Sequence, residues 1–136
     1  MDKKHEKMLA KAQQYAANAV ITYEGIAQMF DKDPSFSEPL LKAARSRQKT
    51  ITALAVITKK EVTGTDSDLK FLKRWSILGK RRLFLDMAGS EKEQGDVLRE
   101  LAKEYPALKT HAQDYYLQAS ALTRMADRLK HKKKKK

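Results

Sequence analysis

Residues 38–61 have the period of an amphipathic helix, because one stripe of six positions follows alternating spacings of three and four, and four of the six are apolar. The apolar stripe of this segment consists of Leu40, Ala43, Leu54 and Ile57. A helix with such a stripe has to bury it against other elements, so the segment predicts a fold of packed helices. Two polar residues, Arg47 and Thr50, lie on the same stripe, at positions that a helical bundle fills with apolar residues or with metal ligands.

Three further segments have the same helical period. The stripe of residues 3–31 consists of Leu9, Ala12, Ala16, Ala19, Tyr23, Ile26 and Phe30, and that of residues 106–130 consists of Leu108, Ala112, Tyr115, Ala119, Leu122, Ala126 and Leu129. A segment that begins at Asp68 places Phe71, Trp75, Leu78 and Leu85 on one face. Because the connections are short, we predict an all-α fold, an up-down four-helix bundle. We expect its third helix to be broken near Gly89, where the residues from Ser90 to Glu93 have the spacing of a capping box.

The composition sets the limits of the domain. The chain has 136 residues, which is enough for one domain with a buried core. We predict a helical domain over residues 1–130 and a disordered, Lys-rich tail over residues 131–136, which is native, the start of a truncated linker, or a tag. The absence of cysteine excludes disulfide scaffolds, iron–sulfur clusters and cysteine zinc sites. No apolar run approaches the length of a membrane span, so we expect a soluble, cytoplasmic protein.

Three stretches of sequence resemble a known family. These stretches are YEGIAQMFDKDPSFSEPLLKAA, KKEV and GSEKEQGDVLRELAKEYPALK. They are similar to the rubrerythrin-like ferritin superfamily, and in particular to the domains that are fused to vacuolar-iron-transporter-type membrane segments. The resemblance covers most of residues 15–120 and implies a ferritin-like bundle with a pair of metal ions in its interior.

The same resemblance implies where the metal ligands would lie. In the family, one Glu comes from each of two helices and a Glu-x-x-His pair comes from each of the other two. The corresponding positions in this chain are Ala16 or Ala19, Arg47, Thr50, Glu91, Tyr115 and Gln118. Only Glu91 keeps a ligand side chain, and an arginine beside a metal ion in a low dielectric is strongly unfavourable, so we predict that the di-metal centre is lost. We expect Arg47 to pair with Glu91 across the former site; in the alternative, the register is off by a turn and Arg47 faces solvent.

A reduced, single-metal site is a further interpretation. Its ligands would be Glu24 on the first helix, Glu91, and His111, which precedes Tyr115 by one helical turn. The plainer interpretation is that these residues are ordinary surface groups. For catalysis there is no nucleophile elbow, no phosphate-binding glycine loop and no His–carboxylate pair at a characteristic spacing.

Residues 69–87 are both basic and aromatic. The cations are Lys70, Lys73, Arg74, Lys80, Arg81 and Arg82, and they flank Phe71, Trp75, Leu78 and Phe84. Such a helix could lie on an anionic membrane surface or follow a nucleic-acid backbone. It is also the pattern of a core helix with a solvated basic face, and we favour this interpretation because the bundle needs the apolar side of the helix.

The sequence therefore predicts a non-catalytic, ferritin-like binding or scaffold module that needs no cofactor and that forms a homodimer or binds a protein partner. The first alternative is a residual iron-binding or peroxide-linked oxidoreductase of the rubrerythrin family, with iron as its cofactor. The second is a binder of anionic membrane surfaces or nucleic acids that acts through the basic helix and the Lys tail.

Overall fold

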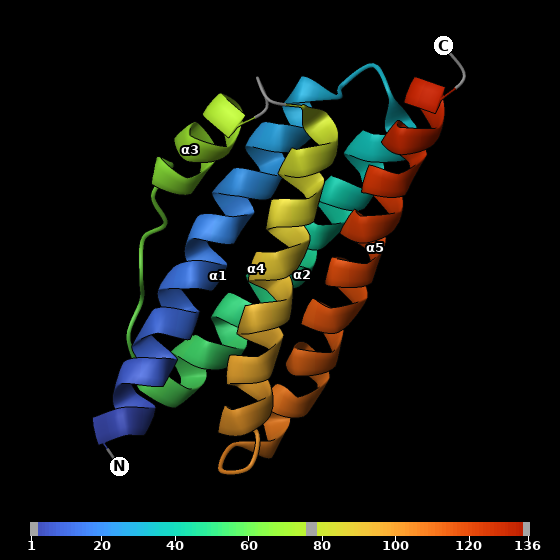
Figure 1. Ribbon diagram of the computed structural model, residues 1–136. Helices are drawn as coiled ribbons and strands as arrows, with labels where there is room; N and C mark the ends of the chain where they lie inside the picture. Colours follow the sequence, from blue (N-terminus) through green and yellow to red (C-terminus); the bar gives the residue numbers. More distant parts are fainter. Residues whose placement is uncertain (1–2, 76–78, 135–136) are drawn as a thin grey trace.

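The computed structural model describes residues 3–75 and 79–134, and every regular element in these ranges is a helix (Figure 1). The elements are α1 (Lys3–Met29), α2 (Pro34–Thr58), α3 (Ser67–Trp75), α4 (Lys80–Leu101), a 3₁₀ turn η2 (Pro106–Leu108) and α5 (Lys109–Lys134). The prediction of an all-α fold is confirmed. Within these ranges, none of the helices combines the length and the hydropathy that a membrane span requires.

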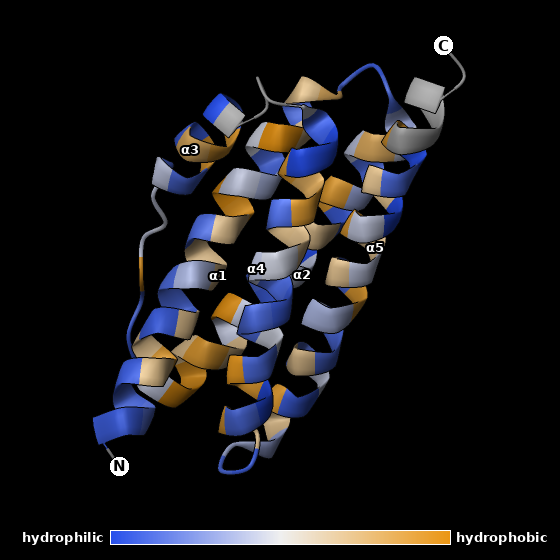
Figure 2. Cartoon of the chain, in the orientation of Figure 1, coloured by the Kyte–Doolittle hydropathy of each residue, from blue (hydrophilic) through white to orange (hydrophobic). Residues whose placement is uncertain are grey.

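The long helices form two antiparallel hairpins, α1 with α2 and α4 with α5 (Figure 1). A tight turn joins α1 to α2, and it ends at Asp33, whose side chain accepts a hydrogen bond from the Ser35 backbone N–H at 3.2 Å. Pro34 then occupies the first turn of α2, where its missing N–H costs nothing. Apolar and polar stretches alternate along every long helix, as amphipathic packing requires (Figure 2).

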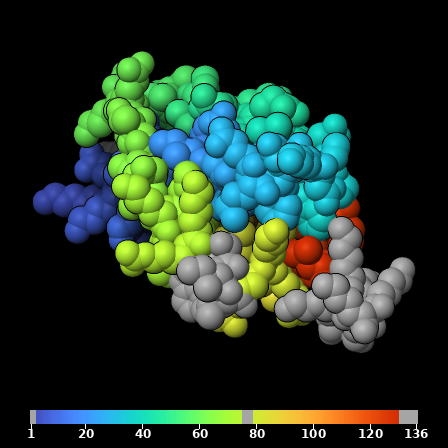
Figure 3. Space-filling view, turned by 90° about the horizontal axis from the view of Figure 1, so that it is seen from above, coloured from blue at the N-terminus to red at the C-terminus, as the bar shows by residue number. Residues whose placement is uncertain are grey.

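A crossover connects the two hairpins and runs back along α1. The Gln13 side-chain amide donates to the Lys60 carbonyl at 2.6 Å, and farther along α1 the Asn18 side chain accepts from the Thr65 backbone N–H at 2.8 Å. The crossover and α3 lie against α1 on one side of the molecule (Figure 3). As a result, α4 starts at the same end as α2 and runs in the same direction. The expected succession of antiparallel neighbours with short connections is therefore wrong at this step.

The predicted third helix is broken, but not near Gly89. The helix α3 ends at Trp75 and α4 begins at Lys80, after Gly79 at φ 129°, while Gly89 lies inside the continuous α4. The expected break near Gly89 is wrong because Ser90 continues the helix instead of capping a new one. Leu78 and the side chain of Trp75, both expected in the core, lie outside the described part of the chain.

One other expectation from the sequence needs correction. Phe71 was expected to face the core, but it lies on the short α3 and exposes 56% of its surface. The helix α5 extends to Lys134, and the disorder expected for the tail over residues 131–136 stays a prediction. Residues 135–136 lie outside the described ranges.

The core has two apolar clusters, one towards each end of the long helices. In one cluster Phe30, Phe36 and Phe84 pack against one another, with ring centroids 5.2–5.8 Å apart. The other cluster is built mainly from buried leucines of α1, α2, α4 and η2, to which α5 adds Ala112 and Tyr115; the leucines are Leu9, Leu54, Leu98, Leu101 and Leu108. Full burial of each such side chain contributes about 1.5–3 kcal/mol to stability. The buried polar residues of the described chain are Gln13 and Thr22 on α1 and a cluster of Arg47, Thr50 and Glu91 in the interior.

Candidate functional site

Arg47 lies inside the helical assembly, with no exposed surface, and it is the largest of the fully buried side chains in the described ranges. Its Nε donates to Glu91 Oε1 at 3.2 Å, its Nη2 donates to Asp114 Oδ2 at 2.8 Å, and its Nη1 donates to Thr50 Oγ1 at 3.1 Å. Each nitrogen of the guanidinium therefore has an acceptor. The predicted pair between Arg47 and Glu91 is confirmed, and the alternative in which Arg47 faces solvent is wrong.

An aromatic ring covers the guanidinium. The Arg47 Cζ atom lies 3.5 Å from the centroid of the Tyr115 ring, which is cation–π geometry. The Tyr15 ring follows, with its centroid 6.0 Å from that of Tyr115. We refer to Arg47, Thr50, Glu91, Asp114 and Tyr115, together with Tyr15, as the buried network. Its members come from α1, α2, α4 and α5, so it joins all the long helices of the described chain.

Glu91 has no exposed surface, and its second oxygen is also paired. The Tyr15 hydroxyl donates to Glu91 Oε2 at 2.7 Å. Burial raises the pKa of Glu91, while the Arg47 charge and then the nearby tyrosine hydroxyls oppose this rise. Burial followed by the Glu91 charge raises the pKa of Tyr15 and Tyr23 well above their ordinary value, so both stay protonated.

The network continues from Thr50 to a histidine on α5. The Thr50 hydroxyl lies 3.2 Å from His111 Nδ1 and 3.2 Å from the Ser46 carbonyl oxygen. Burial, and then the Arg47 charge, lower the pKa of His111, which keeps the imidazole neutral near pH 7. The Thr50 hydroxyl can donate only one hydrogen bond. It can donate to His111 Nδ1 only when the imidazole proton is on Nε2; when Nδ1 carries the proton, Thr50 donates to the Ser46 carbonyl oxygen.

The structure does not bring together the metal-ligand sets considered from the sequence. In the described ranges, no group of three or more His, Cys, Asp or Glu side chains is placed to hold a metal ion. Glu24 lies exposed on α1, so the candidate set of Glu24, Glu91 and His111 does not come together. Glu91 is directed at the Arg47 guanidinium, and His111 is separated from it by Thr50 and Arg47.

The remaining positions implied by the family resemblance fall in and around the network. Ala16 and Ala19 are buried on α1. Gln118 is half-buried on α5 and lines a groove between α2 and α5 instead of joining the network.

Sequence reasoning missed Tyr15, Tyr23 and Asp114. Tyr15, Ala19 and Tyr23 follow one another at spacings of four, and His111 and Asp114 are three apart, so helical neighbour spacing would have placed them beside the residues already singled out.

The six basic residues expected to bind an anionic surface do not form one helix face. They divide between α3 and the first turn of α4 because the helix is interrupted between Trp75 and Lys80. Some of their charges already have partners: Lys70 pairs with Asp66 at 3.6 Å, and Arg82 pairs with Asp86 at 3.3 Å. Binding to an anionic surface stays a prediction.

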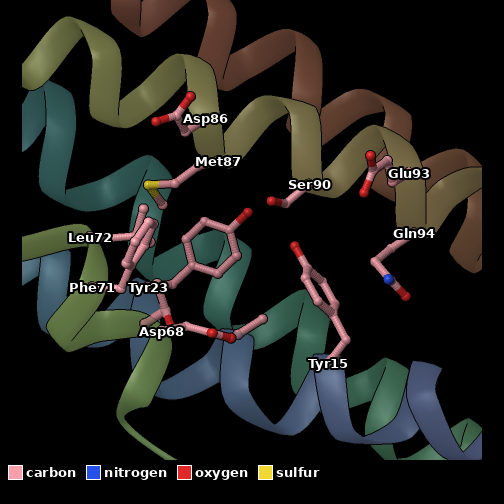
Figure 4. Close-up of a pocket in the computed structure, with 12 residues that line it drawn as sticks. Tyr15, Tyr23, Asp68, Phe71, Leu72, Asp86, Met87, Ser90, Glu93 and Gln94 are labelled. Atoms are coloured by element: carbon pink, nitrogen blue, oxygen red, sulfur yellow. The ribbon is translucent and has the colours of Figure 1, made fainter. Parts of the chain in front are cut away.

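A cavity of about 320 Å³ lies beside the buried network, between α1, α3 and α4 (Figure 4). Tyr15 and Tyr23 stand side by side in it, with their hydroxyl groups towards α4. The two tyrosines therefore separate the ion pair from the cavity.

The comparisons with known proteins give no relative. No family model matches the chain, and neither does a curated protein or a solved structure. The resemblance to rubrerythrin-like proteins therefore stays a prediction, and the functional argument depends on the geometry of the site.

Proposed function

We propose that this protein is a non-catalytic, ferritin-like helical bundle related to rubrerythrins, which has lost its di-metal centre and acts as a binding or scaffold module. The observation that carries the proposal is the buried Arg47 guanidinium, which lies against Glu91 and Asp114 in the interior of the helices. In the family pattern this position belongs to a Glu-x-x-His pair. The positively charged Arg47 side chain therefore occupies a position at which the family pattern has a metal ligand.

The charge of Arg47 strongly disfavours a metal ion at this position. Two unit charges 4 Å apart repel each other by about 4 kcal/mol at an effective dielectric constant of about 20, so a divalent ion beside Arg47 would be repelled by about 8 kcal/mol. The carboxylates are also no longer free, because both already accept hydrogen bonds from the guanidinium. A metal ion would have to displace Arg47 and leave a buried cation without a partner.

The path of the chain adds support. Ferritin-like folds join their helical hairpins by a single long crossover. Here the connection between α2 and α4 is long, runs along α1 and includes α3. This succession is expected for a ferritin-like bundle and not for one with short loops throughout.

Elemental analysis tests the loss of the metal centre. The protein would be produced in medium supplemented with iron and manganese and analysed after gel filtration, and we expect far less than one metal ion per chain. Near-stoichiometric iron, together with peroxide-dependent iron oxidation that is lost in Glu91→Ala, would refute the proposal and establish the oxidoreductase alternative.

A gain-of-binding variant tests the assignment of the positions. Arg47→Glu combined with Thr50→His restores a Glu-x-x-His pair beside Glu91, Asp114 and His111. A bound metal stabilises the folded chain by RT ln(1 + [L]/Kd), so Co²⁺ should raise the melting temperature of this variant and leave the wild type unchanged. The matched control is Arg45→Glu with Gln48→His, which has the same spacing at exposed positions. Equal responses in the two double variants would show that Arg47 and Thr50 are not at former ligand positions.

We also propose that a second copy of the chain covers the face formed by α2 and α5. This face has a groove and two exposed leucines, Leu41 and Leu117, which expose 40% and 67% of their surface. Charges of both signs line the groove: Glu38, Lys42, Arg45, Asp114, Arg124, Asp127 and Arg128. A two-fold interface brings one patch against itself, which requires both signs in that patch. Sedimentation velocity should show a dimer that Leu117→Glu converts to monomer; a monomeric wild type would contradict this interface.

A further inference from the structure

The cavity beside the buried network is lined by three helices, each with a different contribution. The helix α1 supplies the tyrosine rings, α3 supplies Phe71 and Asp68, and α4 supplies a row of polar side chains (Figure 4). The volume of about 320 Å³ is large enough for a small organic molecule.

The free polar groups of this cavity can all accept hydrogen bonds, and the Thr22 hydroxyl can also donate one. Thr22 lines the cavity with only 6% of its surface exposed, and its hydroxyl has no hydrogen-bond partner in the described structure. The carbonyl oxygen of Gln94, on the opposite wall, is likewise buried without a partner. The Tyr15 hydroxyl gives its proton to Glu91, so towards the cavity it offers an oxygen lone pair and a ring face. Buried polar atoms without partners are costly, and a ligand with N–H donors would satisfy all of these oxygens.

The charges of the cavity indicate that the ligand is a cation. Three carboxylates, those of Asp68, Asp86 and Glu93, line the cavity. Asp86 pairs with Arg82 at 3.3 Å, whereas Asp68 and Glu93 form no ion pair within the described ranges. This local acidity is opposite to the net charge of the chain, which is +12. A cation that binds here has to be held by the cavity itself because the protein as a whole repels it.

The spacing of the carboxylates distinguishes an organic cation from a metal ion. Asp86 and Glu93 are seven residues apart on α4, which separates them by about 10 Å along the helix axis. Carboxylates this far apart cannot coordinate one metal ion, but they can each meet one end of a ligand that has two charged ends. Near Asp86, Met87 together with Leu72 and Phe71 of α3 offers apolar surface for a methylene chain, and the Tyr23 and Tyr15 rings follow in the direction of Glu93.

We propose that this cavity binds an aliphatic diamine or polyamine, with ammonium groups at the carboxylates, N–H donors to Thr22 and Gln94, and the methylene chain against the apolar and aromatic wall. The inference deepens the proposed binding role, on which it rests, by naming the class of ligand. Amine binding and metal content are measured separately, so either proposal can fail without the other.

Calorimetric titration of the full chain with spermidine and 1,4-diaminobutane tests the inference, with 1,4-butanediol as the uncharged ligand of matched length. We expect saturable binding of both amines that weakens as salt is added, and no binding of the diol. Each exposed carboxylate contributes about two- to fivefold to the affinity, so Asp68→Asn with Glu93→Gln should weaken spermidine binding by about tenfold. The control is Glu100→Gln, which removes an exposed carboxylate of α4 outside the cavity and should leave the affinity unchanged.

Thr22→Val separates a ligand contact from a structural hydroxyl. We expect this variant to raise the melting temperature of the free protein, because it removes a buried hydroxyl without a partner, and to reduce the further rise produced by spermidine. If spermidine raises the melting temperature of Thr22→Val as much as that of the wild type, Thr22 does not contact the ligand. The absence of saturable binding at millimolar spermidine in low salt, or equal binding by the Asp68→Asn, Glu93→Gln double variant, would overturn the whole inference.

Discussion

Removing the Arg47 side-chain charge should destabilise the protein in a pH-dependent way. In Arg47→Met the side chain keeps much of its length, but Glu91 is left buried without its cation. Breaking a buried ion pair by removing one partner typically costs about 3–5 kcal/mol. The folded variant can lower this cost by protonating Glu91. From the ordinary pKa of 4.5, protonation at about pH 7 costs about 3 kcal/mol, at 1.36 kcal/mol per pH unit.

The sign of the pH dependence follows from the same carboxyl group. Burial already raises the pKa of Glu91 in the wild type, and removing Arg47 removes the largest opposing effect, so the pKa in the variant rises further. A folded state that binds the proton more tightly than the unfolded state gains stability as the pH falls. At about pH 5 protonation costs less than about 1 kcal/mol, so the deficit of Arg47→Met should shrink by about 2 kcal/mol between pH 7 and pH 5.

Urea unfolding of the wild type and Arg47→Met at both pH values measures these quantities. Arg45→Met, an exposed arginine on the same helix, is the matched control and should change stability by less than about 0.5 kcal/mol. Arg47→Met with Glu91→Leu removes both buried charges and should recover most of the lost stability. A deficit below about 1 kcal/mol at pH 7, or one that does not change with pH, would refute the reasoning.

Three further predictions concern the glycines and the histidine. Gly89→Ala should stabilise the protein by about 0.5–1 kcal/mol in urea unfolding, because Gly89 is exposed within α4 and an added Cβ meets nothing within 4 Å; a loss of stability would place a break there after all. Gly64→Ala should destabilise by about 1–3 kcal/mol, because its Cβ would lie 2.4 Å from the Ala17 carbonyl oxygen and push the crossover off α1; an unchanged midpoint would contradict that close approach. His111 has its pKa lowered from 6.5 by burial and then by Arg47, so it contributes stability above about pH 6.5 that is lost as the pH falls. His111→Gln should therefore lose less stability than the wild type between pH 7.5 and pH 5.5, and equal losses would be the contrary result.

The sequence predicted α1, α2 and α5 well because each has a long stripe of helical spacing. The residues of the crossover, 59–66, have no such pattern, and their path depends on contacts with α1 that are remote in sequence. The helix α2 is about 37 Å long. A connection that runs back over this length, as the crossover does, needs more residues than a short turn. Local patterns decide where a helix lies in the sequence, but not the end of the molecule at which the next one starts.

The same distinction applies to the site. Arg47 was recognisable because it interrupts an apolar stripe, and Glu91 followed from the family resemblance. Asp114 and Tyr15 could not be assigned as partners, because pairing across helices depends on the relative heights of α1, α4 and α5. The break between α3 and α4 was missed for a related reason: Gly79 is one signal among several in a segment whose apolar spacing continues through it.

Small residues of α1 and the Arg47 network both belong to the buried interior. Ala12, Ala16 and Ala19 are buried, and Ala12 shares an apolar cluster with Tyr115, whose ring covers the Arg47 guanidinium. A buried guanidinium has directional donors, so its acceptors on α4 and α5 are held at fixed heights relative to α2. Apolar packing alone tolerates small slides of one helix along another, whereas this network loses hydrogen bonds with any slide. We therefore interpret the Arg47 network as the element that fixes the register of the long helices, a role that a metal centre fulfils when ligands from all helices converge on it.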